Sequence, residues 1–354
     1  MSSSPSSSSL ALSIDGHRLD KDAGGGQVAG RRRKAVAKLD ACIHEIRSIA
    51  GNERFLLGQT AAEMQQCAVG GTIVVVNVTR FRSDAILVSH GAVKALSLPG
   101  LLASDAEAWL GKKWTGRAVR RHERPQKNKE YLEYLPGLAV GQRLPRIWWI
   151  GTGLGSSMPF HAAGVHSPGS TENAFSKAVS SYTPSIKALE YAQQRARATD
   201  GARGALLIAT MPTTPGQASP DARKPPDLPD KKVEQDRLTV HRVSELSLAQ
   251  ARIAYLSACS TAENGAARLS DEVIHVVSGF QVAGFPYVVG CLWPSIDSVC
   301  VEVASGFYQS LLQRRGAGWD GGEVAWAVRE AVMAVREAEM DQPLVWAPFV
   351  HFGA

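Results

Sequence analysis

The chain has 354 residues, 44% of them hydrophobic, which is enough to bury the cores of two domains. Its formal net charge of +6 gathers in runs such as Arg31–Lys34, and no nucleic-acid-binding motif accompanies them. Five scattered cysteines do not suit a disulfide framework, and no apolar stretch reaches the roughly 18 residues of a membrane span. We therefore expect a cytoplasmic protein, or a nuclear one in view of the basic run, that uses no cofactor, metal, nucleic acid or membrane.

The first 143 residues divide into a tail and a small lobe. Residues 1–34 are rich in Ser and Gly and predict a disordered tail. Apolar spacing within Ala35–Cys67 predicts two amphipathic helices, and residues 72–78 and 84–90 predict the two strands of a β-hairpin. A helix follows over 98–110, with Ser104 as its expected N-cap. We assign residues 35–143 to an N-terminal lobe of α+β type.

Residues 144–354 alternate between apolar strands and amphipathic helices. The strands are expected at 146–150, 205–209, 253–256 and 287–292, and the helices at 185–197, 271–283 and 298–312. Such alternation is typical of a mostly parallel sheet with helices on both faces. The glycines of Gly151–Gly155 suggest a phosphate cradle. However, Ser156 stands where the third glycine of that motif belongs, so we favour a permissive loop over a nucleotide site.

Cys259 lies where a short apolar strand gives way to small polar residues. The segment Ile253–Leu256 is β-capable, whereas Ser257–Ala262 is small and polar, so Cys259 is expected at the carboxyl end of a buried strand. This is where α/β folds present a nucleophile. A free cysteine is also among the most buried residue types, and a structural thiol is the alternative.

A series of motifs places this cysteine in a family context. They are Arg-Ile-Trp-Trp-Ile-Gly (146–151), Pro-Phe-His-Ala-Ala-Gly (159–164), Ser-Tyr-Thr-Pro-Ser-Ile-Lys-Ala-Leu (181–189), Leu-Leu-Ile-Ala-Thr-Met-Pro (206–212), Leu-Ser-Ala-Cys-Ser-Thr-Ala (256–262), Gly-Phe-Gln-Val-Ala-Gly-Phe (279–285) and Cys-Leu-Trp-Pro (291–294). In this order they resemble the CHAT family of caspase-like cysteine peptidases (clan CD), in its fungal form. The resemblance implies a three-layer caspase-like α/β fold over 144–354, with Cys259 as the nucleophile.

The family's catalytic base is missing from the expected place. The resemblance implies a His-Gly pair at the end of the preceding sheet strand, but residues 211–250 are rich in Pro, Asp, Lys, Arg and Ser and contain only His241, which Arg follows. An unassisted thiol has a pKa of about 8.5, and general-base assistance contributes about 10²–10⁴-fold to such reactions. Loss of that strand also predicts unpaired backbone groups on the strands beside it.

Other residues are weighed by their place in the motifs. The resemblance puts His161 at the rim of the site without making it the base, so a pocket or structural role is favoured, and His241 remains the weak alternative as base. Asp271 and Glu272 are expected to begin a helix. They either stabilise it by interacting with its dipole or form a pocket wall that prefers a basic substrate side chain. Trp293, at the end of a strand, is expected in packing or in the substrate groove.

Two functions remain open from the sequence. One is a caspase-like cysteine endopeptidase, weakened by loss of the base, that acts on a peptide or protein substrate. The other is a non-catalytic CHAT scaffold or peptide-binding module. An incompletely read gene for an active peptidase would give the same sequence. Substrate, activating partner and oligomeric state have no signal in the sequence.

Overall fold

The computed structural model describes residues 25–111, 144–199, 205–210, 245, 248, 250–257, 276–293, 295–313 and 321–354. The chain forms two compact units, residues 1–59 and residues 60–354. Each unit is described by itself below.

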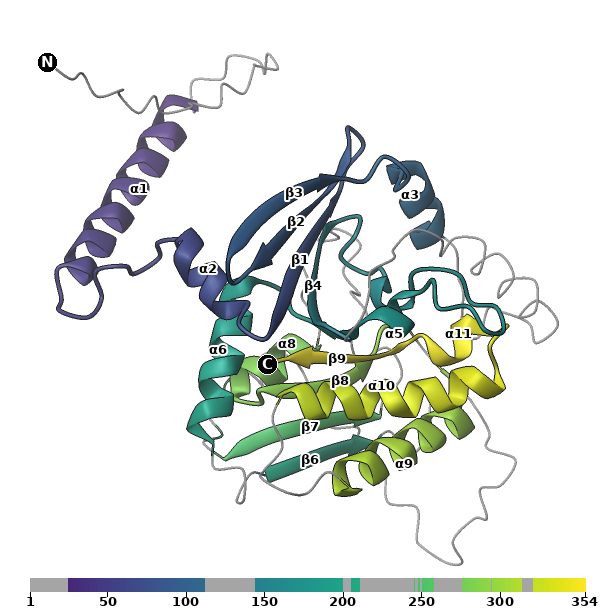
Figure 1. The fold of residues 1–354 in the computed structure, drawn as a ribbon. Helices are drawn as coiled ribbons and strands as arrows, with labels where there is room; N and C mark the ends of the chain where they lie inside the picture. The colour runs from purple at the N-terminus through teal and green to yellow at the C-terminus, as the bar shows by residue number, and fades with distance from the viewer. Residues whose placement is uncertain are drawn as a thin grey trace, which may run out of the picture. The chain divides into compact units, whose positions relative to one another are not determined.

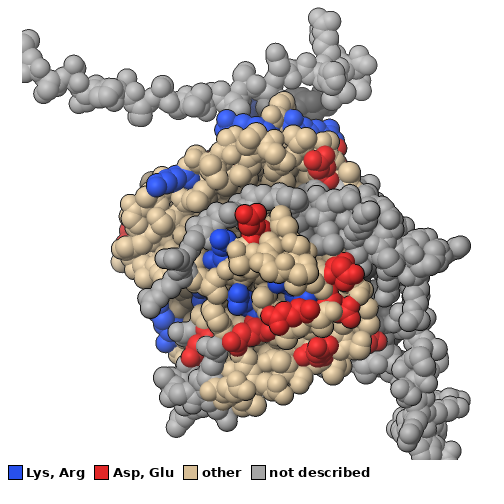
Figure 2. Space-filling model, turned by 45° about the vertical axis from the view of Figure 1, so that its right-hand side comes forward, with Lys and Arg blue, Asp and Glu red and all other residues tan. Residues whose placement is uncertain are grey.

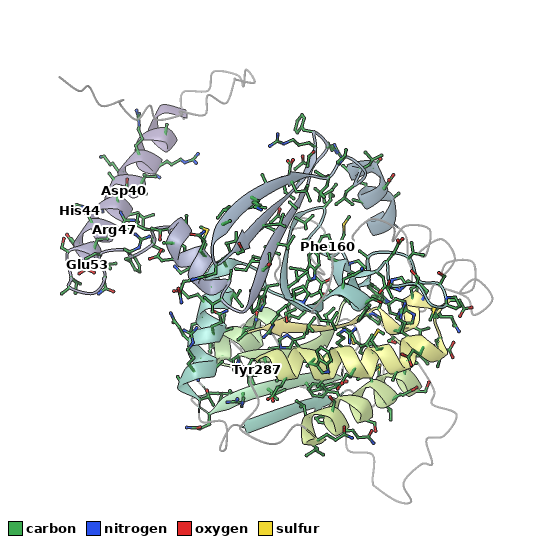
Figure 3. The ribbon with its side chains drawn as sticks, in the orientation of Figure 1. Asp40, His44, Arg47, Glu53, Phe160 and Tyr287 are labelled. Carbon is green, nitrogen blue, oxygen red and sulfur yellow. The ribbon has the colours of Figure 1, made fainter. Side chains whose placement is uncertain are left out.

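The first unit contains the helix α1 (Gly25–Arg47) and the turns that follow it. Asp40, His44 and Arg47 project from α1, and Glu53 lies in the following turns (Figure 3). Arg47 Nε donates to the carbonyl oxygen of Phe55 at 2.8 Å, which ties the turns back to the helix. Because α1 begins at Gly25, its first turns lie within the stretch that the composition assigned to the tail.

A nine-stranded sheet forms the centre of the second unit in its described part, with the order β3-β2-β1-β4-β5-β9-β8-β7-β6 (Figure 1). The strands are β1 (Gly71–Val78), β2 (Ser83–Ser89), β3 (Ala92–Ser97), β4 (Arg146–Gly153), β5 (Val179–Tyr182), β6 (Ala205–Thr210), β7 (Ala251–Ser257), β8 (Tyr287–Cys291) and β9 (Phe349–Gly353). Neighbours pair in parallel at β1–β4, β4–β5, β6–β7 and β7–β8. The hairpin pairs and β8–β9 are antiparallel. The predicted mostly parallel α/β sheet is confirmed.

Helices cover both faces of this sheet. Alternate residues of β1 enter two cores: Ile73 packs in a cluster with Cys67 of α2 and Leu189 of α6, while Val74 and Val76 join the larger core. The larger core also holds apolar residues of α9 and α10. The helices of this unit are α2 (Ala61–Cys67), α3 (Ala103–Gly111), the 3-10 helix η2 (Phe160–Ala162), α5 (Ala174–Lys177), α6 (Ile186–Ala198), α8 (Val276–Ala283), α9 (Asp297–Gln313), α10 (Gly321–Ala338) and α11 (Pro343–Trp346).

The predicted hairpin forms, and it continues the same sheet, because β1 pairs with β4 along its whole length. One local prediction is wrong: α3 begins at Ala103, so Ser104 is inside its first turn and is not the N-cap. The predicted domain boundary at residues 143 and 144 borders undescribed residues and stays a prediction.

The strand before Cys259 is paired on both sides. β6 pairs directly with β7 at six positions, from Ala205 opposite Ala251 to Thr210 opposite Ser257, with one irregularity between Ala205 and Leu206. On its other side β7 pairs with β8. The expectation of unpaired backbone beside β7 is therefore wrong, because β6 occupies that flank.

The C-terminal strand depends on a glycine. Gly353 has φ +110°, and a Cβ there would lie 2.0 Å from the carbonyl oxygen of Pro286. Gly169 also has positive φ (+77°), but a Cβ there would meet no atom within 4 Å. We predict that Gly353→Ala lowers the free energy of unfolding by about 1–3 kcal/mol more than Gly169→Ala, because only the first adds a backbone clash to the strain. Urea unfolding of both variants measures the difference, and equal losses would contradict the described packing of β9.

Candidate active site at the carboxyl edge of the sheet

Chain segments from four strands meet at one edge of the sheet. β7 ends at Ser257, two residues before Cys259, and its parallel neighbour β8 ends at Cys291 on the same edge. The end of β8 pairs with the start of β9, where Cys291 is opposite Phe349. His161, in the loop after β4, contacts Ala347 just before β9. The carboxyl ends of β4, β7 and β8 therefore gather around the start of β9, where an α/β fold places its site.

The course of β9 follows from contacts at its two ends. Its last residues lie beside the start of β4, since Trp148 Nε1 donates to the carbonyl oxygen of Gly353 at 3.1 Å. Ala347, before β9 begins, instead contacts His161 beyond the end of β4. Between these points β5 and β9 share a single bridge of the parallel type, Tyr182 to Phe352. β9 thus crosses from the candidate site to the opposite edge of the sheet.

Four of the predicted site residues lie outside the described residues: Cys259, His241, Asp271 and Glu272. Their roles stay predictions. The structure places the two others, His161 and Trp293, and both are buried. Trp293 follows β8, and its Nε1 donates to the carbonyl oxygen of Leu344 in α11 at 3.0 Å. That bond joins the end of β8 to α11.

His161 is fixed by both of its ring nitrogens. Nε2 lies 2.9 Å from the carbonyl oxygen of Ala347, which can only accept, so Nε2 carries the proton and donates. Nδ1 then accepts from the hydroxyl of Tyr182 at 2.7 Å. Burial lowers the pKa of His161 to about 3 and raises that of Tyr182. The imidazole is neutral at physiological pH, and its one lone pair is already used.

His166, on the same loop, is engaged in the same way. Its Nε2 donates to the carbonyl oxygen of Ala162 at 2.8 Å, and its Nδ1 accepts from Arg336 Nε of α10 at 3.0 Å. Burial, together with the neighbouring Arg336, lowers the pKa of His166 to about 4. The His166 ring also packs edge-on against Trp346, with centroids 4.9 Å apart. Both histidines are therefore neutral, and both nitrogens of each ring are engaged in hydrogen bonds.

The glycines at the end of β4 avoid steric clashes with neighbouring backbone. A Cβ on Gly151 would lie 2.1 Å from the carbonyl oxygen of Gly155, and one on Gly153 would lie 2.8 Å from that of Val78. Gly153 also has φ +58°. The chain turns tightly from the end of β4 against β1, which favours the permissive-loop interpretation over a phosphate cradle. Phe160, shown in Figure 3, stacks on Trp149 just beyond it, with ring centroids 5.4 Å apart.

Sequence reasoning missed the partners of these histidines. Tyr182 belongs to a family motif, but nothing marked it as a hydrogen-bond donor to His161, and Arg336 and Ala347 lie in segments for which no element was predicted.

On the face in Figure 2, acidic and basic side chains are interspersed among uncharged ones. Within the described ranges, no three His, Cys, Asp or Glu side chains gather closely enough to hold a metal. No described helix combines the length and the apolar character that crossing a membrane requires.

The His161–Tyr182 bond gives a stability prediction. Tyr182→Phe leaves the ring in place but deprives Nδ1 of its donor, which should lower the free energy of unfolding by about 1–3 kcal/mol. Tyr191→Phe is the matched control, because Tyr191 is 40% exposed and its hydroxyl makes only a 3.4 Å contact with the carbonyl oxygen of Val282. Tyr191→Phe should lower the free energy of unfolding by no more than about 0.5 kcal/mol. Urea denaturation measures both, and comparable losses would contradict the role given to Tyr182.

Burial of neutral histidines predicts acid sensitivity. An unfolded histidine has a pKa of about 6.5, whereas burial lowers the pKa of His161 to about 3 and of His166 to about 4. Between pH 6.5 and 5 the unfolded chain binds protons that the folded one does not. Stability is therefore complete above about pH 6.5 and falls with decreasing pH, by up to about 1.4 kcal/mol per pH unit for each histidine.

Denaturant midpoints measured across pH 5–7 test this slope. His161→Gln should reduce it by the contribution of one proton, whatever its effect on stability at pH 7. His90→Gln, at an exposed position, should leave it unchanged. A slope that His161→Gln does not alter would mean that His161 is protonated in the folded protein.

The chain is similar to one protein family and to several solved structures. The CHAT domain family matches residues 228–354. A chain in the crystal structure of the Saccharomyces cerevisiae separase–securin complex at 2.6 Å aligns with a TM-score of 0.55 and 11% identity, covering 83% of this chain and 31% of that chain. A second structure of the complex, at 3.0 Å, gives a TM-score of 0.53 and 10% identity, covering 83% of this chain and 30% of the other. No curated protein matches the sequence.

This chain thus spans about a third of those solved chains, and at such identity the likeness concerns the fold alone. The strand order and the family match both indicate the same α/β fold for this part of the chain. Residues 228–354 match the CHAT domain family, and the α/β fold of the chain is similar to that of the separase structures.

Proposed function

We propose that this protein is a CHAT-domain relative of the caspase-like cysteine endopeptidases in which Cys259 remains but peptidase activity is weak or lost. In this proposal the carboxyl edge of the sheet binds a peptide or protein segment. The observation that carries it is the direct pairing of β6 with β7. The resembling family places a strand with a His-Gly pair inside the sheet, just before the cysteine strand, and here β6 occupies that flank of β7.

The histidines of the rim support the same proposal. His161 and His166 each spend one ring nitrogen on a carbonyl oxygen and the other on a donor. A general base needs a free lone pair within hydrogen-bond reach of the thiol. Neither imidazole offers one without breaking a buried hydrogen bond. His241 stays the alternative base, and its participation would make the protein a competent peptidase.

The chemistry expected of Cys259 follows from this. In a competent peptidase the thiolate attacks the scissile carbonyl, the base takes the thiol proton, and backbone N–H groups hold the oxyanion. Without a base only a few per cent of a thiol with a pKa of about 8.5 is thiolate at neutral pH. Binding of a peptide at the edge needs no base, so recognition survives where turnover does not.

A protein partner fits this proposal. The solved structures of similar fold are of separase in complex with securin, which is a protein. For this chain we propose a peptide or protein segment that approaches the edge formed by the ends of β7 and β8. Asp271 and Glu272 are the proposed wall for a basic side chain of that segment, and Trp293 contributes to packing at the end of β8.

The ionisation of Cys259 tests the proposal. Iodoacetamide labelling of Cys259, quantified by mass spectrometry of its peptide, should rise with pH through about 8.5, because no imidazolium stabilises the thiolate. Cys259→Ser supplies the background from the other thiols. Peptides with a basic residue should be cleaved slowly or not at all, and any slow cleavage should be lost in Cys259→Ser.

Two further variants sharpen the test. His241→Gln should leave the labelling profile unchanged if that residue is not the base. Fast labelling already at pH 6, together with cleavage that both Cys259→Ser and His241→Gln abolish, would overturn the proposal and make the protein an active peptidase.

A further inference from the structure

The helix α1 carries an apolar stripe that the described residues of its own unit leave largely uncovered. Val36, Leu39, Ile43 and Ile46 follow one another at i, i+3, i+7 and i+10, so they lie on one face of the helix. Val36 is 49% exposed and Leu39 58% exposed, while Ile43 and Ile46 are half-buried. We call these four residues the α1 stripe.

A helix of this kind needs its apolar face to be covered. α1 has 23 residues, and an isolated helix is marginal in water, because most helical stability in proteins comes from packing of an amphipathic face. The α1 stripe occupies only the a and d positions of two heptads, which is the narrow seam that one facing helix covers in a coiled coil. α1 also contains no Phe, Tyr or Trp, and the apolar face of a membrane-surface helix is usually wider and rich in such residues.

The charges beside the α1 stripe are mainly positive. α1 contains six Lys or Arg residues and two Asp or Glu residues, which leaves a net charge of +4. In the heptad that puts Val36 at a and Leu39 at d, Arg33 and Arg47 are at the flanking position e, and Arg32 is at d. The residues at the other flanking position, g, carry no charge. Residues at e and g set the choice of partner in a coiled coil.

These charges disfavour a second copy of α1 as the facing helix. In a parallel pair Arg32 faces Arg32, and the arginines at e meet uncharged residues at g. In an antiparallel pair that aligns the two stripes, Arg33 faces Arg47 and Asp40 faces Asp40. Facing like charges oppose association. A helix with acidic residues beside its own seam would instead attract Arg32, Arg33 and Arg47.

We propose that α1 is a docking helix for an acidic amphipathic helix of another protein, which covers the α1 stripe in a two-helix coiled coil. The stripe supplies the apolar seam, and the arginines at d and e select an acidic partner. This interaction belongs to the first unit and uses none of the residues at the carboxyl edge of the sheet, so it is independent of the proposed function.

Binding of a designed peptide to the full chain tests the proposal. The probe is a helical peptide of about four heptads, with isoleucine at a, leucine at d and glutamate at e and g. Its control is the same peptide with lysine at e and g. Isothermal titration calorimetry at low salt should show binding of the acidic peptide and at least about tenfold weaker binding of the basic one.

Three variants of the full chain locate the contact. Leu39→Glu places a charge in the seam and should weaken binding of the acidic peptide by about 30-fold or more. Ala41→Glu is the matched control, because it adds the same charge at an exposed position opposite the stripe, and it should change the affinity by no more than about threefold. Asp40→Lys removes the one acidic residue at e and should strengthen binding by about two- to fivefold, a gain that a damaged helix cannot produce.

Several results would overturn the proposal. One is equal affinity for the acidic and basic peptides, or binding of neither. Another is a dimer of the chain that Leu39→Glu dissociates, because a second copy would then cover the α1 stripe. Binding to phosphatidylserine vesicles that Leu39→Glu abolishes would assign the stripe to a membrane surface. A lower melting temperature of Leu39→Glu without peptide, with Ala41→Glu unchanged, would mean that the stripe is already buried within the chain.

Discussion

The two hydrogen bonds of the neutral His161 imidazole hold together the chain segments at the carboxyl edge of the sheet. The imidazole donates to the segment before β9 and accepts from Tyr182 at the end of β5, so one ring joins the loop after β4 to two other strands. A protonated ring would reverse the direction of the Tyr182 bond and place a charge in an apolar surrounding, which is costly. The edge is thus built on a histidine that must stay uncharged, and this is incompatible with use of the same ring as a proton carrier.

Buried arginines are accommodated by the same type of contact. Arg252 Nη1 donates to the carbonyl oxygen of Thr199, and Arg336 Nε donates to His166. Arg252 lies over the ring of Tyr287, and Arg336 over that of Trp346. Burial lowers the pKa of Arg336. A delocalised guanidinium tolerates carbonyl and aromatic neighbours better than a compact ammonium would, which explains why these positions are arginine and not lysine.

The flank of β7 links fold and function. A sheet that lost an internal strand would leave two ladders unsatisfied, and β6 prevents this by pairing directly with β7. The register irregularity at Ala205 and Leu206 shows where the two strands adjust to each other. In the described residues β7 therefore has a paired neighbour on each side. This favours a protein in which the framework of a peptidase is kept while its catalytic pair is not, as the proposed function requires.

The sequence by itself determined the class of fold and the resemblance to the CHAT family. Strands of continuous apolar residues such as Tyr287–Cys291, alternating with amphipathic helices, can be satisfied only by a covered parallel sheet, so local pattern and global fold agree. The same pattern put Cys259 just past a strand that ends at Ser257.

Other elements had no local signal. β5 has only four residues, and β9 is buried at all five positions, so neither shows the alternation that marks a half-buried strand. Only the tertiary structure decided that β6 would pair directly with β7 and that both ring nitrogens of His161 and His166 would be engaged in hydrogen bonds. Pairing partners and buried hydrogen bonds join residues far apart in the chain, such as His161 and Ala347, and no local pattern of residues encodes which of them will meet.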